Sequence, residues 1–394
     1  MAEDSRVVIV DGARVPTGTF GGFYADVPNS EMGATAAREA LRRAGVSATD
    51  VDEFVVGCVG QTGPDAYISR AIALGAGAPV TTTAQTVNRV CGSGLQAIWT
   101  AAAEIRLGQA DVVVAGGSEN MTRQPYMDFG GATARSLADR RLVNGTQALI
   151  SDPFSGQAMG VTAERVAEKY GISRAAQDEF ACQSQTRTQA ALAAGAFDKE
   201  RVPFTKETRH GTETLRTEEQ PRAGVTVEKL AKLRPVFQEN GTVTAGNSSG
   251  INDGAAMLVL MRASEARARG LHPLGELVAF SAVGDSPELM GYAPRYAIEK
   301  VLRRAGLTLA EIGWIELNEA FAAQAVAVIR DAGLDPELTN PLGGAISLGH
   351  PVGASGAIIS LRALKNQQER GIEHSLVTLC IGGGQAVAAI FRAL

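Results

Sequence analysis

Residues Thr86–Arg106 read TVNRVCGSGLQAIWTAAAEIR and place Cys91 between a strand-like run and a glycine turn. After the turn, apolar residues recur at helical spacing, which predicts a helix whose first turn begins at or just after Cys91. The unpaired N–H groups and the positive dipole end of such a helix favour thiolate over thiol, and the thiolate is the nucleophile. Cys91 is therefore a candidate nucleophile, and a buried structural cysteine is the other interpretation of the pattern.

Length and composition limit the possible functions. The chain has 394 residues, too many for one ordinary core, so we expect two or three domain-sized units. Its 37 basic and 42 acidic residues give a net charge of −5 without a long basic run, which argues against nucleic acid as a partner. No apolar run approaches the roughly 20 residues of a membrane span, so we expect no membrane association. The four cysteines show no CxxC spacing, which fits a reducing cytosol and predicts a cytoplasmic protein.

Short apolar runs alternate with helical patterns over most of the chain. Examples are RVVIVD at residues 6–11 and DVVVA at residues 111–115. The alternation predicts an α/β fold with a mostly parallel sheet that is covered by helices on both faces.

The middle of the chain, residues 121–250, has a different texture, with polar and glycine-rich patches. It contains helical patterns over residues 161–170 and 174–194, the second with Ser173 as a good N-cap. Residues 209–224 are polar, so we expect them to be exposed. The whole segment is interpreted as an inserted subdomain, because it is too long for a loop.

An internal repeat relates the two ends of the chain. Residues 38–56 match residues 299–317, and both copies contain the string LRRAG, followed by a short loop and a strand-like run. A looser match relates residues 111–114 to residues 376–379. Two copies of one α/β unit explain these matches. The predicted division is residues 1–120 with 251–271, residues 121–250, and residues 272–394.

The repeat predicts a counterpart for Cys91 in the second copy. Residues 343–356 read GGAISLGHPVGASG and precede another helical pattern. His350 lies there with Pro351 after it, and proline suits the first position of a helix. Pseudo-symmetric halves would bring Cys91 and His350 together at their junction, where ligand sites are common. His350 is therefore the candidate base for Cys91, with a purely structural role at a helix start as the alternative.

Two further candidates follow strand-like runs. Cys380 precedes three glycines in the string LCIGGG, and Asn318 lies in LNEAF. The glycines leave backbone N–H groups free to approach a ligand closely, as an oxyanion hole requires. A core cysteine and a turn asparagine are the structural alternatives.

Taken together, these motifs resemble the thiolase family of acyl-CoA C-acyltransferases. The matching segments are spread in the family's order over almost the whole chain, and their details are most similar to the biosynthetic, acetyl-CoA acetyltransferase branch. They are the NxxCxSG-type segment at residues 88–94, AGNSSGINDGA at 245–255, NEAFA at 318–322, GHPxGASG at 349–356 and CxGGG at 380–384. The fold implied has two pseudo-symmetric α/β halves packed as layers, with an inserted α-rich loop subdomain.

The resemblance implies a ping-pong Claisen condensation, with acetoacetyl-CoA as the expected product, and the reverse thiolysis. Cys91, activated by His350, would carry the acyl group, and Cys380 would remove the α-proton of acetyl-CoA. One oxyanion hole would be His350 with a water held by Asn318. The other would be the backbone N–H groups of Cys91 and Gly382.

The resemblance also implies the substrate contacts and the assembly. Ser249 would contact the pantetheine arm of CoA, and Arg222 its nucleotide end, while Met159, Ala320 and Phe321 would also contact the substrate. CoA and acyl-CoA are the expected small-molecule partners. No metal and no further cofactor are expected. The expected assembly is a homotetramer, a dimer of dimers with tetramer contacts from the inserted subdomain.

Three departures from the family bear on the substrate. Ala158 stands where acetoacetyl-preferring members commonly carry histidine, so the pocket could be wider. Gln385-Ala386 replaces Met-Gly after CxGGG, and the run around Arg295 departs from Gly-x-Gly-Pro-x-Pro. A degradative 3-ketoacyl-CoA thiolase of broader chain length therefore stays open as an alternative, as do a non-catalytic acyl-CoA- or lipid-binding relative, a ketoacyl synthase and a cysteine hydrolase. The synthase would need a histidine where this chain has Cys380.

Overall fold

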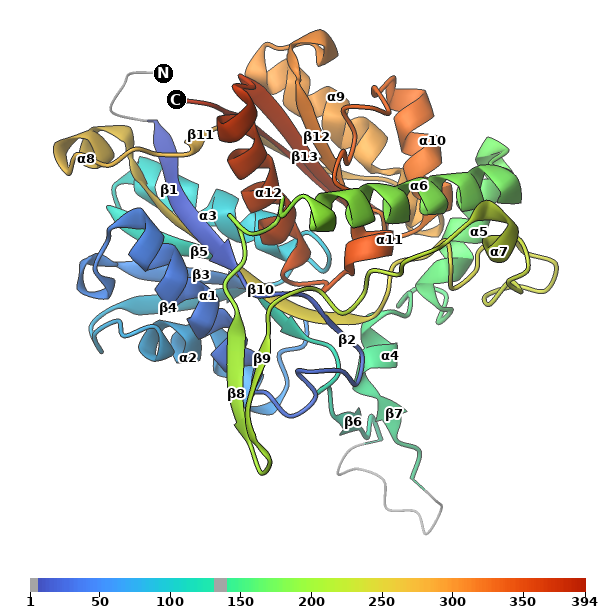
Figure 1. Cartoon of the computed structure of the whole chain (residues 1–394), viewed down its shortest axis with the longest axis horizontal. Coiled ribbons are helices and arrows are strands. Elements are labelled where there is room, and N and C mark those ends of the chain that lie inside the picture. The colour runs from blue at the N-terminus through green and yellow to red at the C-terminus, as the bar shows by residue number, and fades with distance from the viewer. Residues whose placement is uncertain (1–5, 131–139) are drawn as a thin grey trace.

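The structure is a computed structural model that describes residues 6–130 and 140–394 (Figure 1). One large sheet joins the two ends of the chain. Its strands are β1 (Val7–Arg14), β2 (Gly18–Thr19), β3 (Glu53–Gly57), β4 (Thr83–Val87), β5 (Val112–Asn120), β10 (Asn252–Arg262), β11 (Gly275–Gly284), β12 (Trp314–Leu317), β13 (His374–Ile381) and β14 (Gln385–Arg392). Their order is β12-β13-β14-β11-β1-β10-β5-β3-β4, with β2 paired to β10.

The sheet is mixed, so the expectation of a mostly parallel sheet is wrong. Only the pairs β3–β4, β3–β5 and β12–β13 are parallel. The pairs β1–β10, β10–β5, β1–β11, β11–β14 and β13–β14 are antiparallel. The difference arises because the last strand of each copy returns without a crossover helix. β14 follows β13 through a glycine turn, and β10 re-enters between β5 and β1 after the long insertion.

The repeated sequences form the same elements in the same order. The series β1-β10-β5-β3 corresponds to β11-β14-β13-β12. In the first series β4 pairs with β3, whereas in the second a single parallel bridge between Ile315 on β12 and Thr339 takes its place. Helices α1 (Asn29–Ala44) and α9 (Pro294–Ala305) both end at a left-handed glycine, Gly45 and Gly306. Glycine adopts that conformation without the steric cost of a Cβ atom.

The helices form three layers around the sheet. α3 (Ser93–Leu107) and α12 (Ser355–Arg370) share the central core with both strand series. The outer faces are covered by α1 and α2 (Ile68–Gly75) on one series and by α9 and α10 (Ala322–Ala332) on the other. Alternate residues of one strand face different cores, as Val113 faces the central core and Val114 an outer core. The remaining helices are α4 (Gly145–Leu149), α5 (Met159–Tyr170), α6 (Arg174–Ala193), α7 (Val227–Leu230), α8 (Ala263–Ala268) and α11 (Ala345–Leu348).

The inserted segment contains the two predicted helices, α5 and α6, and Ser173 caps α6 by accepting the N–H of Ala176. It also contains two short antiparallel strand pairs, β6 (Tyr126–Met127) with β7 (Val143–Asn144) and the hairpin of β8 (Phe204–Thr208) with β9 (Gly211–Leu215). The β8–β9 hairpin projects from the body in Figure 1. The expectation that residues 209–224 are exposed is wrong at Glu218, which is buried because it pairs with Arg14 and Arg201.

Within residues 6–130 and 140–394, none of the helices has the length and apolar character needed to cross a membrane.

The contact between α3 and α12 is backbone against backbone. A Cβ atom added at Gly356 would lie 2.4 Å from the backbone nitrogen of Leu95, and one added at Gly94 would lie 2.7 Å from that of Ala357. Real Cβ atoms do not approach backbone so closely, so both glycines are required for the contact.

We expect Gly356→Ala to lower the free energy of unfolding by about 1–3 kcal/mol, because overpacking against backbone cannot be relieved by a rotamer change. The gain in helix propensity from alanine, at most about 1 kcal/mol, works against this loss. Urea unfolding measures the change. Gly284→Ala is the control, since a Cβ atom there meets nothing within 4 Å. Equal stability of the two variants would contradict the close contact.

Candidate active site

A cavity of about 530 Å³ lies where the loops before α3 and α12 meet. Most of the site residues predicted from the sequence line it. They are Cys91, His350 and Gly382 together with Met159, Arg222, Ser249, Ala320 and Phe321. The other two, Asn318 and Cys380, are buried and are not among the described residues that line this cavity.

Cys91 lies between β4 and α3 in a tightly bonded turn. Helix α3 begins at Ser93, two residues later, and its N-cap is Gly92. The Ser93 hydroxyl donates to the carbonyl of Val90 at 2.6 Å and accepts the backbone N–H of Arg89 at 2.9 Å. Val90 has a φ of 46°, which is uncommon for a β-branched residue. The local bonds therefore hold the turn in a conformation that turns the cysteine into the cavity.

The protonation state of Cys91 depends on two opposing effects. Withdrawal from bulk water raises the pKa of the thiol to about 11, while the backbone N–H groups of Gly382 and of Cys91 itself act in the opposite direction. The backbone N–H groups at the helix start therefore act in the predicted direction, but desolvation of the charged form outweighs them, so the thiol keeps its proton at neutral pH. Cys91 needs a base to become a nucleophile.

His350 lies in the loop between α11 and α12. The prediction that Pro351 begins the helix is wrong, since α12 begins at Ser355. The carbonyl of Pro351 instead accepts the backbone N–H groups of Ala354 and Ser355 and forms the turn that precedes the helix. The backbone N–H of His350 donates to Asn252 Oδ1 at 3.0 Å, which fixes the loop to β10.

The hydrogen bonds of the imidazole assign its tautomer. Nδ1 of His350 lies 2.6 Å from Ser355 Oγ, and that hydroxyl lies 2.9 Å from the carbonyl oxygen of Pro351. The hydroxyl has one proton, which it donates to the carbonyl, so Nδ1–H is the donor to Oγ. Nε2 therefore keeps its lone pair. Burial lowers the pKa of His350 to about 4, so the ring is neutral at pH 7 and can accept a proton.

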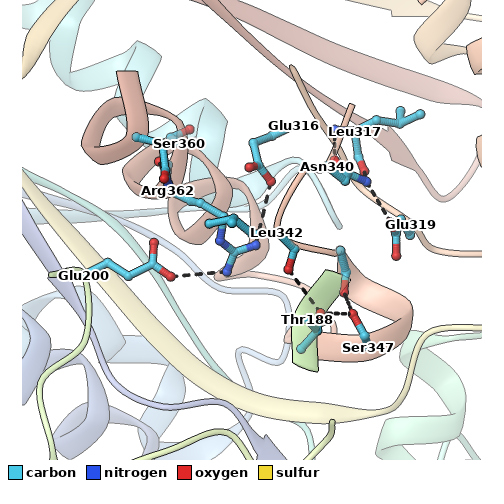
Figure 2. Close-up of polar contacts among 12 residues, drawn as sticks. Thr188, Glu200, Glu316, Leu317, Glu319, Asn340, Leu342, Ser347, Ser360 and Arg362 are labelled. Carbon is cyan, nitrogen blue, oxygen red and sulfur yellow. Dashed lines mark hydrogen bonds and ion pairs between the residues drawn. The ribbon is translucent and has the colours of Figure 1, made fainter. Parts of the chain in front are cut away.

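Asn318 contacts that lone pair and is held by its chain neighbours. Its Nδ2 lies 3.4 Å from His350 Nε2. Figure 2 shows Asn340 next to both flanking residues: its amide bonds the N–H and the carbonyl of Leu317, at 2.9 and 2.8 Å, and Glu319 Oε1 at 2.9 Å. Asn340 therefore fixes the backbone before Asn318 and the side chain of the residue after it.

A buried ionic cluster lies behind the same asparagine. Arg362 lies between Glu200 and Glu316, at 3.4 and 3.7 Å (Figure 2), and Arg14 meets Glu200 and Glu218 at 2.7 Å each. Arg14, Glu218 and Arg362 line an inner cavity of about 20 Å³, together with Asn318 and Ser355. A polar cavity of that size is large enough for one water molecule.

Cys380 lies near the end of β13 and packs with Met290 and Ala320, against which Met159 and Phe321 lie. Burial raises the pKa of its thiol well above the ordinary range, and the charge of a Cys91 thiolate would raise it further. The two sulfurs are thus close enough to influence each other's ionisation. A buried base of this kind is a strong one once it is deprotonated.

Several site residues escaped the sequence reasoning. Ser355 and Asn340 orient His350 and Asn318 as described above. Glu119, on β5, accepts the N–H groups of Val59, Gly60 and Gly353 and so joins the His350 loop to the first copy. Of these residues, only Ser355 could have been recognised from the sequence, because the pair Ser-Gly begins both α3 and α12 and so belongs to the internal repeat.

Comparison with known proteins agrees with the resemblance read from the motifs. Residues 7–264 match the family model described as "Thiolase, N-terminal domain", and residues 271–393 match "Thiolase, C-terminal domain". The beta-ketothiolase BktB of Cupriavidus necator is 49% identical over 98% of this chain and 99% of its own. The crystal structure of the Bacillus anthracis acetyl-CoA acetyltransferase matches with a TM-score of 0.97 at 41% identity over 99% of both chains. That of human mitochondrial 3-ketoacyl-CoA thiolase in complex with CoA has a TM-score of 0.95 at 38% identity, also over 99% of both chains.

We expect Ser355→Ala to slow the alkylation of Cys91 by iodoacetamide about 10²-fold, because Nδ1 loses its acceptor and the lone pair at Nε2 is no longer fixed. Ser355→Thr, which keeps the hydroxyl, should restore the rate. Peptide mapping by mass spectrometry gives the rate at Cys91 alone.

The matched control is Ser360→Ala on the same helix. Its buried hydroxyl makes the same bond to the carbonyl four residues earlier, at 2.7 Å from Gly356, and forms no contact with His350. If Ser360→Ala slowed alkylation as much as Ser355→Ala, the tautomer assignment would lose its support.

Proposed function

The chain belongs to the thiolase family, and from that premise we propose how its own residues carry out the family's reaction. The protein is an acyl-CoA C-acyltransferase: it binds CoA thioesters, condenses acetyl-CoA with an acyl-CoA to a 3-ketoacyl-CoA with release of CoA, and catalyses the reverse thiolysis. The observation that carries the residue assignment is the neutral His350 lone pair in one cavity with Cys91.

The first half-reaction forms an acyl-enzyme. His350 Nε2 takes the proton of Cys91, and the sulfur attacks the thioester carbonyl carbon. The bond from that carbon to the CoA sulfur breaks, and the Cys380 thiol supplies the proton that leaves with CoA. The developing oxyanion accepts the backbone N–H groups of Cys91 and Gly382, which already act on the Cys91 sulfur.

The second half-reaction forms the carbon–carbon bond. The Cys380 thiolate removes the α-proton of acetyl-CoA, and the enolate carbon attacks the acyl group on Cys91. The acyl–sulfur bond breaks, and the proton held by His350 returns to Cys91. The enolate oxygen is stabilised by protonated His350 and by a water held by Asn318.

The outer part of the cavity suits the CoA arm. Ser249 lies on a loop whose backbone N–H donates to the carbonyl of Ala320 at 3.0 Å, so it is held beside the reacting centre. Met159 and Phe321 supply apolar wall for the pantetheine arm. The backbone of Arg222 is bonded to Gln185 at 3.0 Å, which leaves its guanidinium for the phosphates of the nucleotide end.

Acyl chains longer than acetyl are the second candidate substrates. Ala158 lines the cavity, and its neighbours in the lining include Leu149, Ile150 and Val236. A methyl group at this position leaves apolar space that an imidazole would fill. The protein is therefore proposed to accept 3-ketoacyl-CoA substrates beyond acetoacetyl-CoA.

The assembly, location and division of the chain are also part of the proposal. β4 is an edge strand with partly exposed residues and no partner strand on its outer side among the described residues, which suits pairing with a second copy. A dimer of such dimers, with tetramer contacts from the inserted subdomain, is the proposed assembly. The proposed units are residues 1–120 with 251–271, 121–250 and 272–394. The four free cysteines suit a cytoplasmic location.

After brief exposure to acetyl-CoA, the protein should carry one acetyl group, detected by intact-protein mass spectrometry. Cys91→Ala should remove the adduct, and Cys182→Ala, a cysteine on α6 away from the cavity, should not. Cys380→Ala should still become acetylated, more slowly because the CoA sulfur then leaves without the proton of Cys380, but it should not condense, because the acceptor of the α-proton is gone. Absence of an adduct on the unaltered protein would support a non-catalytic binding role instead.

A panel of 3-ketoacyl-CoA chain lengths tests the wider pocket. Ala158→His should reduce kcat/KM for 3-ketohexanoyl-CoA at least tenfold relative to acetoacetyl-CoA, since filling an apolar pocket discriminates by about this much. Acetoacetyl-CoA serves as the internal control. An unchanged ratio in thiolysis assays would mean that Ala158 does not limit the acyl chain.

A further inference from the structure

Gln324 is a buried polar residue beside Cys380 to which no step has yet been assigned. We propose that Gln324 is a positioning residue that holds the S–H proton of Cys380 and makes the Cys380 thiolate a strong base. The inference rests on the proposed role of Cys380 in the condensation. It is carried by the contacts of one amide group.

The orientation of that amide is fixed. Gln324 is the third residue of α10 and is fully buried. Its Oε1 accepts the backbone N–H of Ala320 at 3.0 Å and that of Phe321 at 3.4 Å. A flipped amide would point N–H groups at both donors and would leave two buried N–H groups without an acceptor. The oxygen therefore stays on the side of the Ala320 and Phe321 backbone.

The same oxygen faces the base. Cys380 Sγ lies 3.9 Å from Gln324 Oε1, so the thiol donates its S–H toward the amide oxygen. The side chain cannot move away easily, because the 3-10 helix Pro287–Tyr292 packs on it: a Cβ atom at Gly291 would lie 2.4 Å from the Gln324 Cβ. Gln324 Nε2 is buried with no hydrogen-bond partner among the described residues. This orientation therefore leaves one donor unpaired while it keeps the oxygen toward the sulfur.

The contact suits the two tasks of Cys380. An amide oxygen accepts a hydrogen bond from a thiol but destabilises a thiolate, because the partial negative charge of the oxygen then faces the negative charge of the sulfur. Cys380 therefore begins the cycle as a thiol, able to give its proton to the departing CoA sulfur. Once deprotonated, the Cys380 thiolate is a strong base, and it takes its proton from the α-carbon of acetyl-CoA. A weakly acidic C–H requires such a base.

Gln324 also joins the base to the rest of the site. Through Ala320 and Phe321 it anchors the loop that carries Asn318. That loop bonds in turn to the Ser249 loop, through the carbonyl of Ala320. A variant must therefore separate loss of the loop anchor from loss of the contact to sulfur.

The test compares the two half-reactions of the full-length protein. Acetylation of Cys91 is followed by release of CoA, and the action of Cys380 by uptake of deuterium at the α-carbon of acetyl-CoA in D₂O. Gln324→Leu should slow deuterium uptake about 10²-fold and leave Cys91 acetylation in place. Gln324→Glu keeps an oxygen for both backbone donors and for the sulfur, so it should retain deuterium uptake.

Gln177→Leu is the matched control, because Gln177 is another fully buried glutamine, on α6, and it bonds Ile172 and Thr242 rather than the active site. It should retain both half-reactions. The inference is overturned if Gln324→Leu keeps deuterium uptake, if it loses both half-reactions together, or if folded Gln324→Glu behaves like Gln324→Leu. Failure of the unaltered protein to exchange deuterium while it acetylates Cys91 would instead overturn the proposed role of Cys380.

Discussion

The contact between α3 and α12 is the constraint on which the site depends. Gly94 and Gly356 let the two helix starts meet backbone against backbone at the centre of the sheet layers. Because each helix follows a loop that carries a reactive residue, this one contact brings Cys91 and His350 to the same cavity. Any side chain at either glycine would move the two loops apart. The repeat thus builds the site by placing two similar helix starts face to face.

Burial at this junction also sets the resting state of the reactive pair. It raises the pKa of Cys91 to about 11 and lowers that of His350 to about 4. Both shifts have the same cause, since each group loses water that would stabilise its charged form. In the unliganded protein the proton therefore stays on sulfur and the imidazole is neutral. In the proposed mechanism, a substrate carbonyl favours proton transfer, because the charge that develops on its oxygen is stabilised by the N–H groups of Cys91 and Gly382.

A feature of this fold can be predicted from the sequence when the residues that form it lie close together along the chain. The LRRAG repeat predicted two equivalent helices and a partner for Cys91, because both signals lie in short segments. Strand direction was mispredicted because an apolar run has no direction of its own. The burial of Glu218 was missed because its partner Arg14 is far away in the sequence. The helix start beside Cys91 can be predicted from the sequence, whereas the loss of water that raises the pKa of its thiol cannot.

In the proposed mechanism, two thiols of the same intrinsic acidity serve different tasks, and their neighbours explain how. Cys91 faces N–H donors, from its own backbone and from Gly382, which favour a charged sulfur during attack and departure. Cys380 faces an acceptor, the amide oxygen of Gln324, which favours the protonated sulfur and makes its thiolate a stronger base. A nucleophile that must also leave gains from a lowered pKa, whereas a base for a carbon acid gains from a raised one. The opposite polarity of these neighbours therefore supports the proposed assignment of the two cysteines to their steps more directly than their positions in the chain do.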